Sequence, residues 1–536
     1  MSREHEIGII VGSTTTSRFT FVINSAASTK PRLGDIVKTY NIDNETIYGI
    51  ITDIHIRAPD PLELGKDYST IAYFAEKLGY TNMLELAEVR ILGARSAQNP
   101  RLHRPSFPPR PNSKVYFPSR EEAEQIYSIQ ARHSITIGKI RHLELAPQLR
   151  LLDIIIKHLA IFGITGAGKS HTVAVLCSRL AEHGVPVVLF DVHRDYVQTF
   201  ENSLIVTFDE REQALLRKHC KEVLLAKLSL EKIKHELPAL LGVEYRHARM
   251  HYFLLKVLKE LEGQMITVEQ LLKKLEREYE LANSRDKESL SALIKRLERL
   301  MDSKLFLHEG ETCCLLTDLL EFTEPEQAAD EEVVNANLPE EFRNITSFVG
   351  GILQPGKIVV LDLFPLTHIE QQMVIYITLS TIFSRCKEHK KRGKPFPVVC
   401  VVEEAHRFAS SHSLSEEIMS TIAREGRKFG MGLWIVSQMP SKLSEEVVSQ
   451  VNTFILHRLI NPKDLAFVRA ACPYLSEEYF TALAQLERGE AVVVGLGIEQ
   501  PAIIKIEEQV YGRPVRIGGG EEELERRIEE LKKTIR

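Results

Sequence analysis

The loop of residues 163–170, with the sequence GITGAGKS, constrains the fold of this chain more than any other segment. It follows an apolar run at residues 159–162 and precedes residues 172–180, whose apolar side chains recur at helical spacing. The glycines therefore lie between a strand and a helix. In that context they let the loop turn its backbone N–H groups inward, and the helix directs its positive end to the same point. The pattern predicts a P-loop that binds a polyphosphate.

Two side chains after the glycines suit a nucleoside triphosphate with magnesium. Lys169 adds a mobile positive charge, and Ser170 places a hydroxyl where it can bind the metal ion between the β and γ phosphates. A glycine-rich turn with an incidental lysine is the alternative, and the strand and helix on either side argue against it. The predicted nucleotide-binding residues are Gly163, Ile164, Thr165, Gly166, Ala167, Gly168, Lys169, Ser170 and His171.

Length and composition limit the class of protein. A chain of 536 residues is too long for one hydrophobic core, and we expect roughly three or four structural units. It has no apolar run of transmembrane length and no N-terminal secretory pattern, so we expect a cytoplasmic protein with no membrane segment. The seven cysteines lack the spacing of a disulfide framework or zinc site, and we expect free thiols. The net charge of −5 argues against nucleic-acid binding over an exposed face but not against a narrow basic channel.

The N-terminal residues 1–100 predict a small β-barrel, because short β-branched and aromatic runs alternate with Ser, Asn and Gly turns. Aromatic and basic residues do not interleave along these runs as a base-stacking platform requires. We therefore favour a docking collar over a nucleic-acid reader. Residues 101–133 begin with prolines among arginines, which predicts an extended linker whose arginines are solvated or contact phosphates.

Residues 134–208 and 341–500 are expected to form the two parts of one doubly wound α/β domain. Residues 187–191 are a continuous apolar run that ends in Asp191, as in a buried parallel strand. Together with the P-loop and its helix, this run forms a strand–loop–helix–strand crossover. That crossover predicts Asp191 at the carboxyl edge of the sheet, beside the phosphates.

Residues 209–340 predict a helical insertion in that domain. His247 and His251 imitate a helical metal-binding pair, but no glutamate follows the first histidine, so we expect packed or exposed histidines rather than a metal site. Apolar residues recur at helical spacing in residues 215–230, 252–261, 268–279 and 290–301.

The C-terminal segment, residues 501–536, is expected to be a latch. Its residues 521–536 follow three glycines and carry apolar residues at helical spacing. This pattern predicts one amphipathic helix, long enough to contact a neighbouring subunit but too short for a stable solitary coiled coil.

Two adjacent acids, Glu403 and Glu404, follow the apolar run of residues 398–402. Side chains alternate along a strand, so the two acids cannot perform the same task. We assign Glu403 to the magnesium shell and Glu404 to orienting or deprotonating the attacking water. A pair of acids that caps the next helix is the alternative.

Three further polar residues are catalytic candidates, in addition to Lys169 and Glu404. Gln438 follows the apolar run of residues 432–437, where an amide can contact both a γ-phosphate and the hydrolytic water. Arg424 and Arg427 are candidates for a cation that stabilises phosphoryl charge from a neighbouring subunit. If one of them acts in this way, the active site exists only in an oligomer. Alternatively, both arginines are solvated or pair with nearby acids.

With these residues assembled, the chain resembles the HerA family of hexameric DNA translocases, in the HerA–FtsK class of P-loop motors. The resemblance implies a RecA-like core and a homo-hexamer that hydrolyses ATP with Mg²⁺ while it moves double-stranded DNA through a central channel. It also implies a NurA-type nuclease partner at the barrel and a role in end resection during recombinational repair. The matching segments are residues 137–139, 163–170, 401–406, 423–430, 437–438 and 488–491.

The resemblance carries roles to individual residues. It implies that Lys169 and Ser170 hold phosphate and magnesium, that Glu404 is the catalytic carboxylate and that Gln438 is the sensor. The arginine that acts in trans would be Arg427 or Arg424.

Two departures from the family are visible. Glu403 stands where an aspartate is commoner. We expect it to retain the metal-binding function, with its carboxylate at a different distance from the backbone. Residues 191–196 read DVHRDY where the family has DPHGEY, so the roles of His193 and Asp195 stay open. Two other functions also stay open. One is an oligomeric ATP-binding scaffold for a nuclease or an antiviral defence effector, and the other is a ring ATPase of conjugation or secretion.

Overall fold

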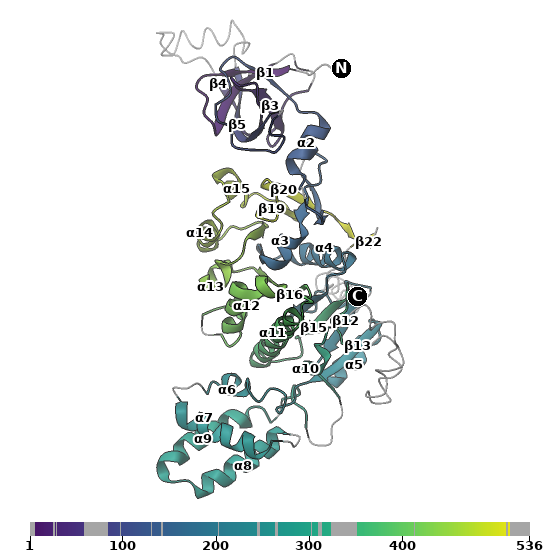
Figure 1. Ribbon diagram of the computed structural model, residues 1–536, viewed down its shortest axis with the longest axis vertical. Helices are drawn as coiled ribbons and strands as arrows, with labels where there is room; N and C mark the ends of the chain where they lie inside the picture. The colour runs from purple at the N-terminus through teal and green to yellow at the C-terminus, as the bar shows by residue number, and fades with distance from the viewer. Residues whose placement is uncertain are drawn as a thin grey trace, which may run out of the picture. The chain divides into compact units, whose positions relative to one another are not determined.

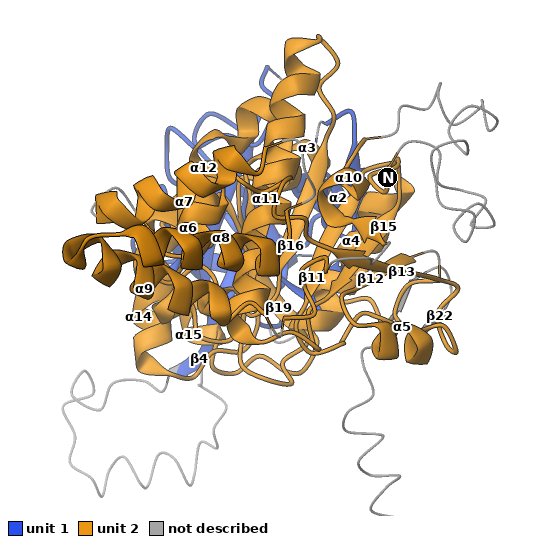
Figure 2. Ribbon diagram, turned by 90° about the horizontal axis from the view of Figure 1, so that it is seen from below, with its two compact units in different colours: residues 1–149, 476–479, 498–505 blue, residues 150–475, 480–497, 506–536 orange. Residues whose placement is uncertain are grey.

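The computed structural model describes residues 6–510 and 513–514, with gaps at 25–26, 28, 58–83, 97, 130, 141–142, 202, 244–246, 263–265, 302, 309–312, 323–350 and 412. The chain divides into two compact units (Figure 2). Unit 1 comprises residues 1–149, 476–479 and 498–505, and unit 2 comprises residues 150–475, 480–497 and 506–536. The predicted C-terminal helix, residues 521–536, lies outside the described residues.

Unit 1 contains a closed antiparallel barrel with the strand order β1-β2-β5-β4-β3-β6. Its interior is apolar and includes the fully buried Ile10, Phe21 and Val37. This confirms the predicted N-terminal barrel. The strands are β1 (Glu6–Val11), β2 (Arg18–Ile23), β3 (Ile36–Tyr40), β4 (Thr46–Arg57), β5 (Leu84–Arg95) and β6 (Lys114–Tyr116).

The segment 101–133 differs from the expected extended linker. Its β6 pairs with β1 and β3 and so closes the barrel. Helix α2 (Arg120–Tyr127) follows and begins with a capping box between Ser119 and Glu122. The Glu122 carboxylate also accepts hydrogen bonds from Lys38 and Tyr48 of the barrel, which fixes the helix on the strands. Unit 1 also holds β7 (Ser134–Ile135) and β8 (Gly138–Ile140).

Unit 2 is built on a sheet with the strand order β14-β13-β12-β15-β11-β16-β17-β10-β18-β19. Its strand pairs are parallel except for β18 and β19, which are antiparallel. The strands are β10 (Leu159–Phe162), β11 (Val187–Asp191), β12 (Ser203–Thr207), β13 (Glu222–Lys227), β14 (Cys314–Leu315), β15 (Ile358–Asp362), β16 (Val398–Val402), β17 (Met431–Ser437), β18 (Thr453–Leu456) and β19 (Glu490–Gly495).

Helices cover both faces of this sheet (Figure 1). The crossover from β10 through α4 (Lys169–Glu182) to β11 runs in one direction along the sheet, and that from β16 through α12 (Glu416–Phe429) to β17 runs in the other. Right-handed crossovers in opposite directions place their helices on opposite faces. Every residue of β11, β15, β16 and β17 is buried, as a strand covered on both sides requires. This confirms a doubly wound α/β core.

The remaining elements of the described chain are mostly short. They are β9 (Leu149–Arg150), α3 (Leu151–Ile156), α5 (Glu210–Leu216), α10 (Leu316–Leu319), α11 (His368–Lys391), η6 (Ala405–Arg407), η7 (Pro440–Lys442), α13 (Glu445–Val448), α14 (Pro462–Ala471), α15 (Glu477–Ala482), β20 (Ala502–Ile506), β21 (Gln509–Val510) and β22 (Arg513–Pro514). Across the residues that the structure describes, no helix is both long and apolar enough to cross a membrane.

The helical insertion lies between β13 and β14. It contains α6 (Leu237–Leu240), α7 (Ala248–Glu260), α8 (Val268–Leu281) and α9 (Ser284–Glu298). Helices α7, α8 and α9 pack against one another, and each carries buried leucines. The prediction of a helix across residues 215–230 is wrong, because that segment contains β13. A short continuous apolar run has no periodicity that separates a buried strand from a buried helix. In the described residues, no cluster of three or more His, Cys, Asp or Glu side chains is arranged to hold a metal.

Candidate active site

The loop after β10 has the backbone of a phosphate-binding turn. Gly166 and Gly168 have φ angles of 76° and 113°, which side chains other than glycine rarely adopt. Gly168 is the N-cap of α4, so the unpaired N–H groups of the first helical turn face the loop. A helix N-terminus with this loop geometry fits an anion.

His457, the residue after β18, supports this loop, and no motif in the sequence pointed to it. A Cβ atom on Gly163 would lie 2.6 Å from the His457 Cβ, so the two backbones pass closely. The ring lies 2.9 Å from the Thr172 hydroxyl through Nε2 and 2.8 Å from the Glu490 carbonyl through Nδ1. Burial lowers the pKa of His457 to about 4, so the ring is neutral at pH 7 and joins the P-loop helix to β19.

Lys169 lies among three carboxylates, those of Glu403, Glu404 and Asp195. Its Nζ donates a hydrogen bond to the Ile164 carbonyl over 3.1 Å. Burial lowers the pKa of Lys169, and the three negative charges oppose that shift. The described site thus gathers more acids than bases at one point.

Glu403 is buried and contacts Tyr196, whose hydroxyl donates to Oε1 of the acid. Burial raises the pKa of Glu403 to about 7, while the hydrogen bond from Tyr196 and the charge of Lys169 act in the opposite direction. Burial thus disfavours the ionised form of this carboxyl. An added cation would favour the ionised form.

Glu404 faces different partners from Glu403, as expected, but not for the expected reason. Strand β16 ends at Val402, and Glu404 has a left-handed φ of 49°, so strand alternation does not apply to it. Its Oε1 accepts a hydrogen bond from Gln438 over 3.0 Å. Its Oε2 lies 3.2 Å from Nδ1 of His406, and burial lowers the pKa of that histidine. In the described structure, Oε2 accepts no hydrogen bond, which leaves it available to a donor.

Gln438 connects the P-loop to this acid. It follows the last residue of β17, where the sequence placed it. Its Oε1 accepts a hydrogen bond from the Thr165 hydroxyl over 2.5 Å, while its Nε2 donates to Glu404. The Gln438 amide therefore links the P-loop to Glu404.

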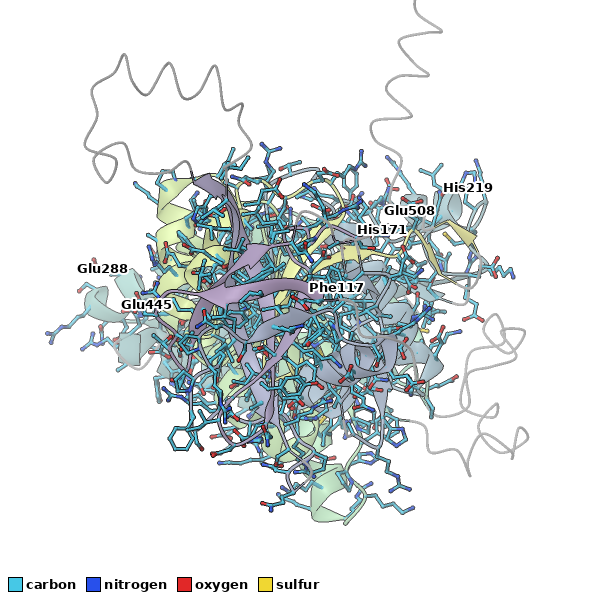
Figure 3. The ribbon with its side chains drawn as sticks, turned by 90° about the horizontal axis from the view of Figure 1, so that it is seen from above. Phe117, His171, His219, Glu288, Glu445 and Glu508 are labelled. Carbon is cyan, nitrogen blue, oxygen red and sulfur yellow. The ribbon has the colours of Figure 1, made fainter. Side chains whose placement is uncertain are left out.

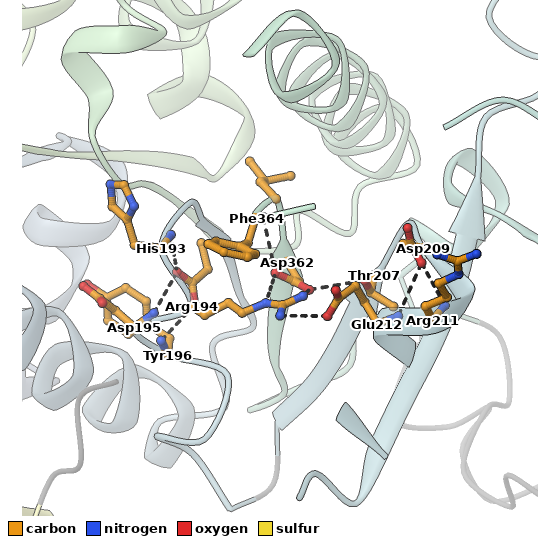
Figure 4. Close-up of polar contacts among 12 residues, drawn as sticks. His193, Arg194, Asp195, Tyr196, Thr207, Asp209, Arg211, Glu212, Asp362 and Phe364 are labelled. Carbon is orange, nitrogen blue, oxygen red and sulfur yellow. Dashed lines mark hydrogen bonds and ion pairs between the residues drawn. The ribbon is translucent and has the colours of Figure 1, made fainter. Parts of the chain in front are cut away.

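Asp191 is the last residue of β11, at the carboxyl edge of the sheet as predicted, but the hydrogen bonds of its side chain within the described residues are not to the P-loop. Its carboxylate instead accepts backbone N–H groups of His193, Asp195 and Tyr196, over 3.3, 3.1 and 2.8 Å (Figure 4). Burial raises the pKa of Asp191 to about 7. Asp191 thus holds the turn that follows β11.

Asp195, whose role the sequence left open, reaches the P-loop from that turn. Its Oδ2 accepts a hydrogen bond from the Ser170 hydroxyl over 3.1 Å. The sequence marked Asp195 only as a departure from a family pattern, and it gave no indication that Tyr196 contacts Glu403. The sequence did contain one signal for such contacts: residues 192–196 follow a predicted parallel strand. The carboxyl ends of parallel strands meet at one edge of a sheet, so residues just after them can reach the P-loop.

The two candidate arginines lie on α12, away from the groups above. Both side chains are exposed, and Arg424 forms an ion pair with Glu446 over 3.0 Å. Arg427 has no ion pair within the described residues. Within the described residues, neither has a hydrogen bond or ion pair to the P-loop of its own chain.

His171, the last predicted P-loop residue, lies in the first turn of α4 and contacts the C-terminal segment. Its Nε2 lies 2.7 Å from the Glu507 carbonyl. His171 and the neighbouring Glu508 lie on the same side of unit 2 in Figure 3. The hydrogen bond of the His171 ring within the described residues is thus to the C-terminal segment, and its role at the phosphates stays a prediction.

A glycine-rich loop between β10 and α4, with two acids after β16 and a glutamine after β17, defines a P-loop ATPase. Residues 135–328 match the family described as "Helicase HerA, central domain", and residues 356–515 match "Helicase HerA-like C-terminal". The chain belongs to the HerA family of helicases.

Curated relatives match nearly the whole chain. One is "DNA double-strand break repair helicase HerA" of Sulfurisphaera tokodaii, 29% identical, with 94% of this chain and 93% of the relative covered. Another, of the same name, is from Pyrococcus furiosus, 28% identical, with 94% of this chain and 92% of the relative covered. Among solved structures, VirB4 of Thermoanaerobacter pseudethanolicus has a TM-score of 0.49 and 18% identity, with 72% of this chain and 99% of that chain covered.

Proposed function

We propose that this chain is a ring-shaped ATPase that moves along double-stranded DNA and acts in double-strand break repair. The observation that supports the proposal is the pair of hydrogen bonds that joins Thr165 of the P-loop through Gln438 to Glu404, the acid that we assign to the attacking water. The relatives named as DNA double-strand break repair helicases support DNA as the polymer along which this protein moves. A homo-hexamer with a NurA-type nuclease at the barrel is the assembly that we propose for it.

In this proposal the P-loop binds the triphosphate. The N–H groups of the first turn of α4 donate hydrogen bonds to the phosphate oxygens, and the ammonium group of Lys169 contacts them. The low exposure of Lys169, at 9%, strengthens its attraction to them because little water screens it. Nucleotide binding also supplies the negative charge near the loop that favours the protonated lysine.

The residues present fit a magnesium ion. The Ser170 hydroxyl and the Glu403 carboxylate are oxygen donors, as is Asp195, which already contacts Ser170. Mg²⁺ prefers oxygen ligands and is held by few side chains together with phosphates, so a small donor set suffices. When bound, the ion neutralises charge on the β and γ phosphates. A cation there would also favour the ionised form of Glu403 at neutral pH.

Glu404 is the group that we assign to the attacking water. Its Oε2, which lies 3.2 Å from Nδ1 of His406, can accept a proton or a hydrogen bond from water, while Gln438 holds Oε1 in place. Because Gln438 also binds Thr165 of the P-loop, a shift of the loop on nucleotide binding moves the acid's partner. This is the route by which nucleotide state would reach β17.

Arg427 is the better candidate for the cation that acts on a neighbouring subunit's nucleotide. Arg424, by contrast, is already paired with Glu446, and using it in trans would require that pair to break. An exposed, unpaired arginine on a helix surface is free to approach another subunit. This assignment requires an oligomer.

The test compares ATP hydrolysis with and without duplex DNA in the wild type, Glu404→Gln and the exposed control Glu445→Gln. We expect duplex DNA to stimulate the wild type and the control. Glu404→Gln should bind ATP as the wild type does but hydrolyse it roughly 10²- to 10⁴-fold more slowly. Equal wild-type turnover with and without DNA would contradict the motor and favour a nucleotide-binding scaffold. Full turnover by Glu404→Gln would reject our assignment of the acid.

A further inference from the structure

The turn of residues 192–196 supplies side chains to the nucleotide site, and its neighbouring strands end in two buried aspartates. Asp191 and Asp362 are register partners at the ends of β11 and β15. Asp191 holds the backbone of the turn through three N–H groups. Asp362 holds one of its side chains, that of Arg194 (Figure 4).

Arg194 forms a fork with Asp362. Its Nε donates to Oδ1 over 3.0 Å and its Nη2 to Oδ2 over 2.7 Å. Its Nη1 lies 2.8 Å from Oε2 of Glu212 on α5, and its guanidinium carbon lies 4.7 Å from the ring centroid of Phe364. A two-point contact of this kind fixes orientation as well as distance.

Asp362 is a rigid anchor for that fork. It is fully buried and also accepts hydrogen bonds from the Thr207 hydroxyl over 3.2 Å and from the Phe364 N–H over 3.3 Å. A buried carboxylate of this kind is costly unless a cation faces it. Arg194 supplies that cation, so the arginine and the strand end restrain each other.

Arg194 occupies a backbone conformation that a glycine would adopt more readily, with a left-handed φ of 64°. The contacts of its side chain offset that cost. The next two residues face the nucleotide site, since Asp195 binds Ser170 and Tyr196 binds Glu403. Anchoring residue 194 therefore restrains the two residues that follow it.

We propose that Arg194 is a positioning residue for ATP hydrolysis, which rests on the function proposed above. Its bridge to Asp362 and Glu212 fixes the turn so that Asp195 stays at Ser170 and Tyr196 stays at Glu403. Arg194 itself contacts none of the reacting groups. Arg194 acts indirectly, by holding the residues that orient the oxygen ligands we assign to magnesium. Contacts outside the ligand set commonly orient metal ligands in this way.

The alternative is that Arg194 only neutralises Asp362 and contributes to folding. Three variants separate the two roles. Arg194→Gly removes the side chain and relieves the left-handed backbone, while Arg194→Lys retains the charge without the fork. Glu212→Gln weakens the contact of Arg194 with α5 and leaves the pair of Arg194 with the buried Asp362 in place. Arg211→Ala, at an exposed position of α5, is the matched control.

Two readouts decide between these roles. The first is hydrogen exchange of the residue 193–196 amides in nucleotide-free protein, which we expect to speed up in Arg194→Gly. The second is the Mg²⁺ concentration for half-maximal ATP hydrolysis, which should rise about tenfold in Arg194→Gly and less in Arg194→Lys and Glu212→Gln. The KM for ATP at saturating Mg²⁺ should stay unchanged, and Arg211→Ala should match the wild type in both readouts.

A lower unfolding temperature for Arg194→Gly, with wild-type exchange and wild-type Mg²⁺ dependence, would overturn the proposal. If that variant does not fold, wild-type values for both Arg194→Lys and Glu212→Gln would overturn it instead. If the wild type shows no Mg²⁺-dependent hydrolysis, the proposed function is what fails. The exchange measurement then still decides whether Arg194 holds the turn.

Discussion

Gln438 donates a hydrogen bond from Nε2 to Oε1 of Glu404 over 3.0 Å. The same amide accepts the Thr165 hydroxyl of the P-loop, so the loop and the acid are two hydrogen bonds apart. Glu404 lies outside β16 in a left-handed conformation, and such strained positions are often found at functional sites. The placement of this acid thus depends on a side chain 34 residues further along the chain, at the end of β17, rather than on its own strand.

We expect Gln438→Ala to lower kcat by roughly 10²-fold while ATP affinity changes little, because the amide orients Glu404 rather than the phosphates. Steady-state hydrolysis and a fluorescent-nucleotide binding assay measure the two effects. Gln485→Ala, at an exposed position, is the control. A loss of binding equal to the loss of kcat would show that Gln438 serves the P-loop instead.

Tyr196→Phe should raise the pKa of Glu403 above its value of about 7, since a hydrogen bond to the ionised form is lost. The acidic limb of the pH profile of kcat/KM should move to higher pH by roughly one unit. Tyr474→Phe, at an exposed tyrosine, should leave the profile in place. An acidic limb that stays in place in Tyr196→Phe would mean that Glu403 does not control it.

His457→Asn should cost less stability in acid than at neutral pH. The folded-state pKa of His457 is about 4, below its ordinary value of 6.5, so the neutral ring stabilises the fold above pH 6.5 and this contribution is lost as the pH falls towards 4. Between pH 6.5 and pH 5 the difference between wild type and variant should shrink by about 2 kcal/mol. Urea unfolding at both pH values measures it, with the exposed His219→Asn as control. A constant difference would contradict a buried neutral ring.

If Arg427 acts on the neighbouring subunit, mixtures of Arg427→Ala with Lys169→Ala subunits should hydrolyse ATP faster than either protein alone. Some interfaces in a mixed ring join an intact arginine to an intact P-loop. Arg424→Ala alone should retain most activity, because Arg424 is paired with Glu446. Mixtures whose rate is the simple average of the two proteins would argue that Arg427 does not act in trans.

The parts of the fold that repeat a strong pattern could be predicted from the sequence. The strand–loop–helix–strand crossover around Gly163 and Lys169 follows from glycine spacing and a buried apolar strand, and the structure has both. Helices α8 and α9 follow from helical apolar spacing. Strand β13 could not be predicted in this way, because its run of apolar residues is too short to distinguish strand from helix.

The long-range contacts of the site could not be predicted from the sequence. Tyr196 and Glu403 are 207 residues apart, and Thr172 and His457 are 285 apart. Only the order of the strands brings such residues together. The left-handed backbone of Glu404 could not be predicted from the sequence either, since the apolar run before it suggested a longer strand.

The central claim is that the P-loop and the two acids surround one magnesium triphosphate. A crystal structure of the wild-type chain with a non-hydrolysable ATP analogue and Mg²⁺ tests it most directly. We expect Lys169 to contact the phosphates, Ser170 and Glu403 to lie at the metal, and Glu404 to face the γ-phosphate through a water. A nucleotide bound at the P-loop with Glu404 turned into a separate cavity would contradict the account.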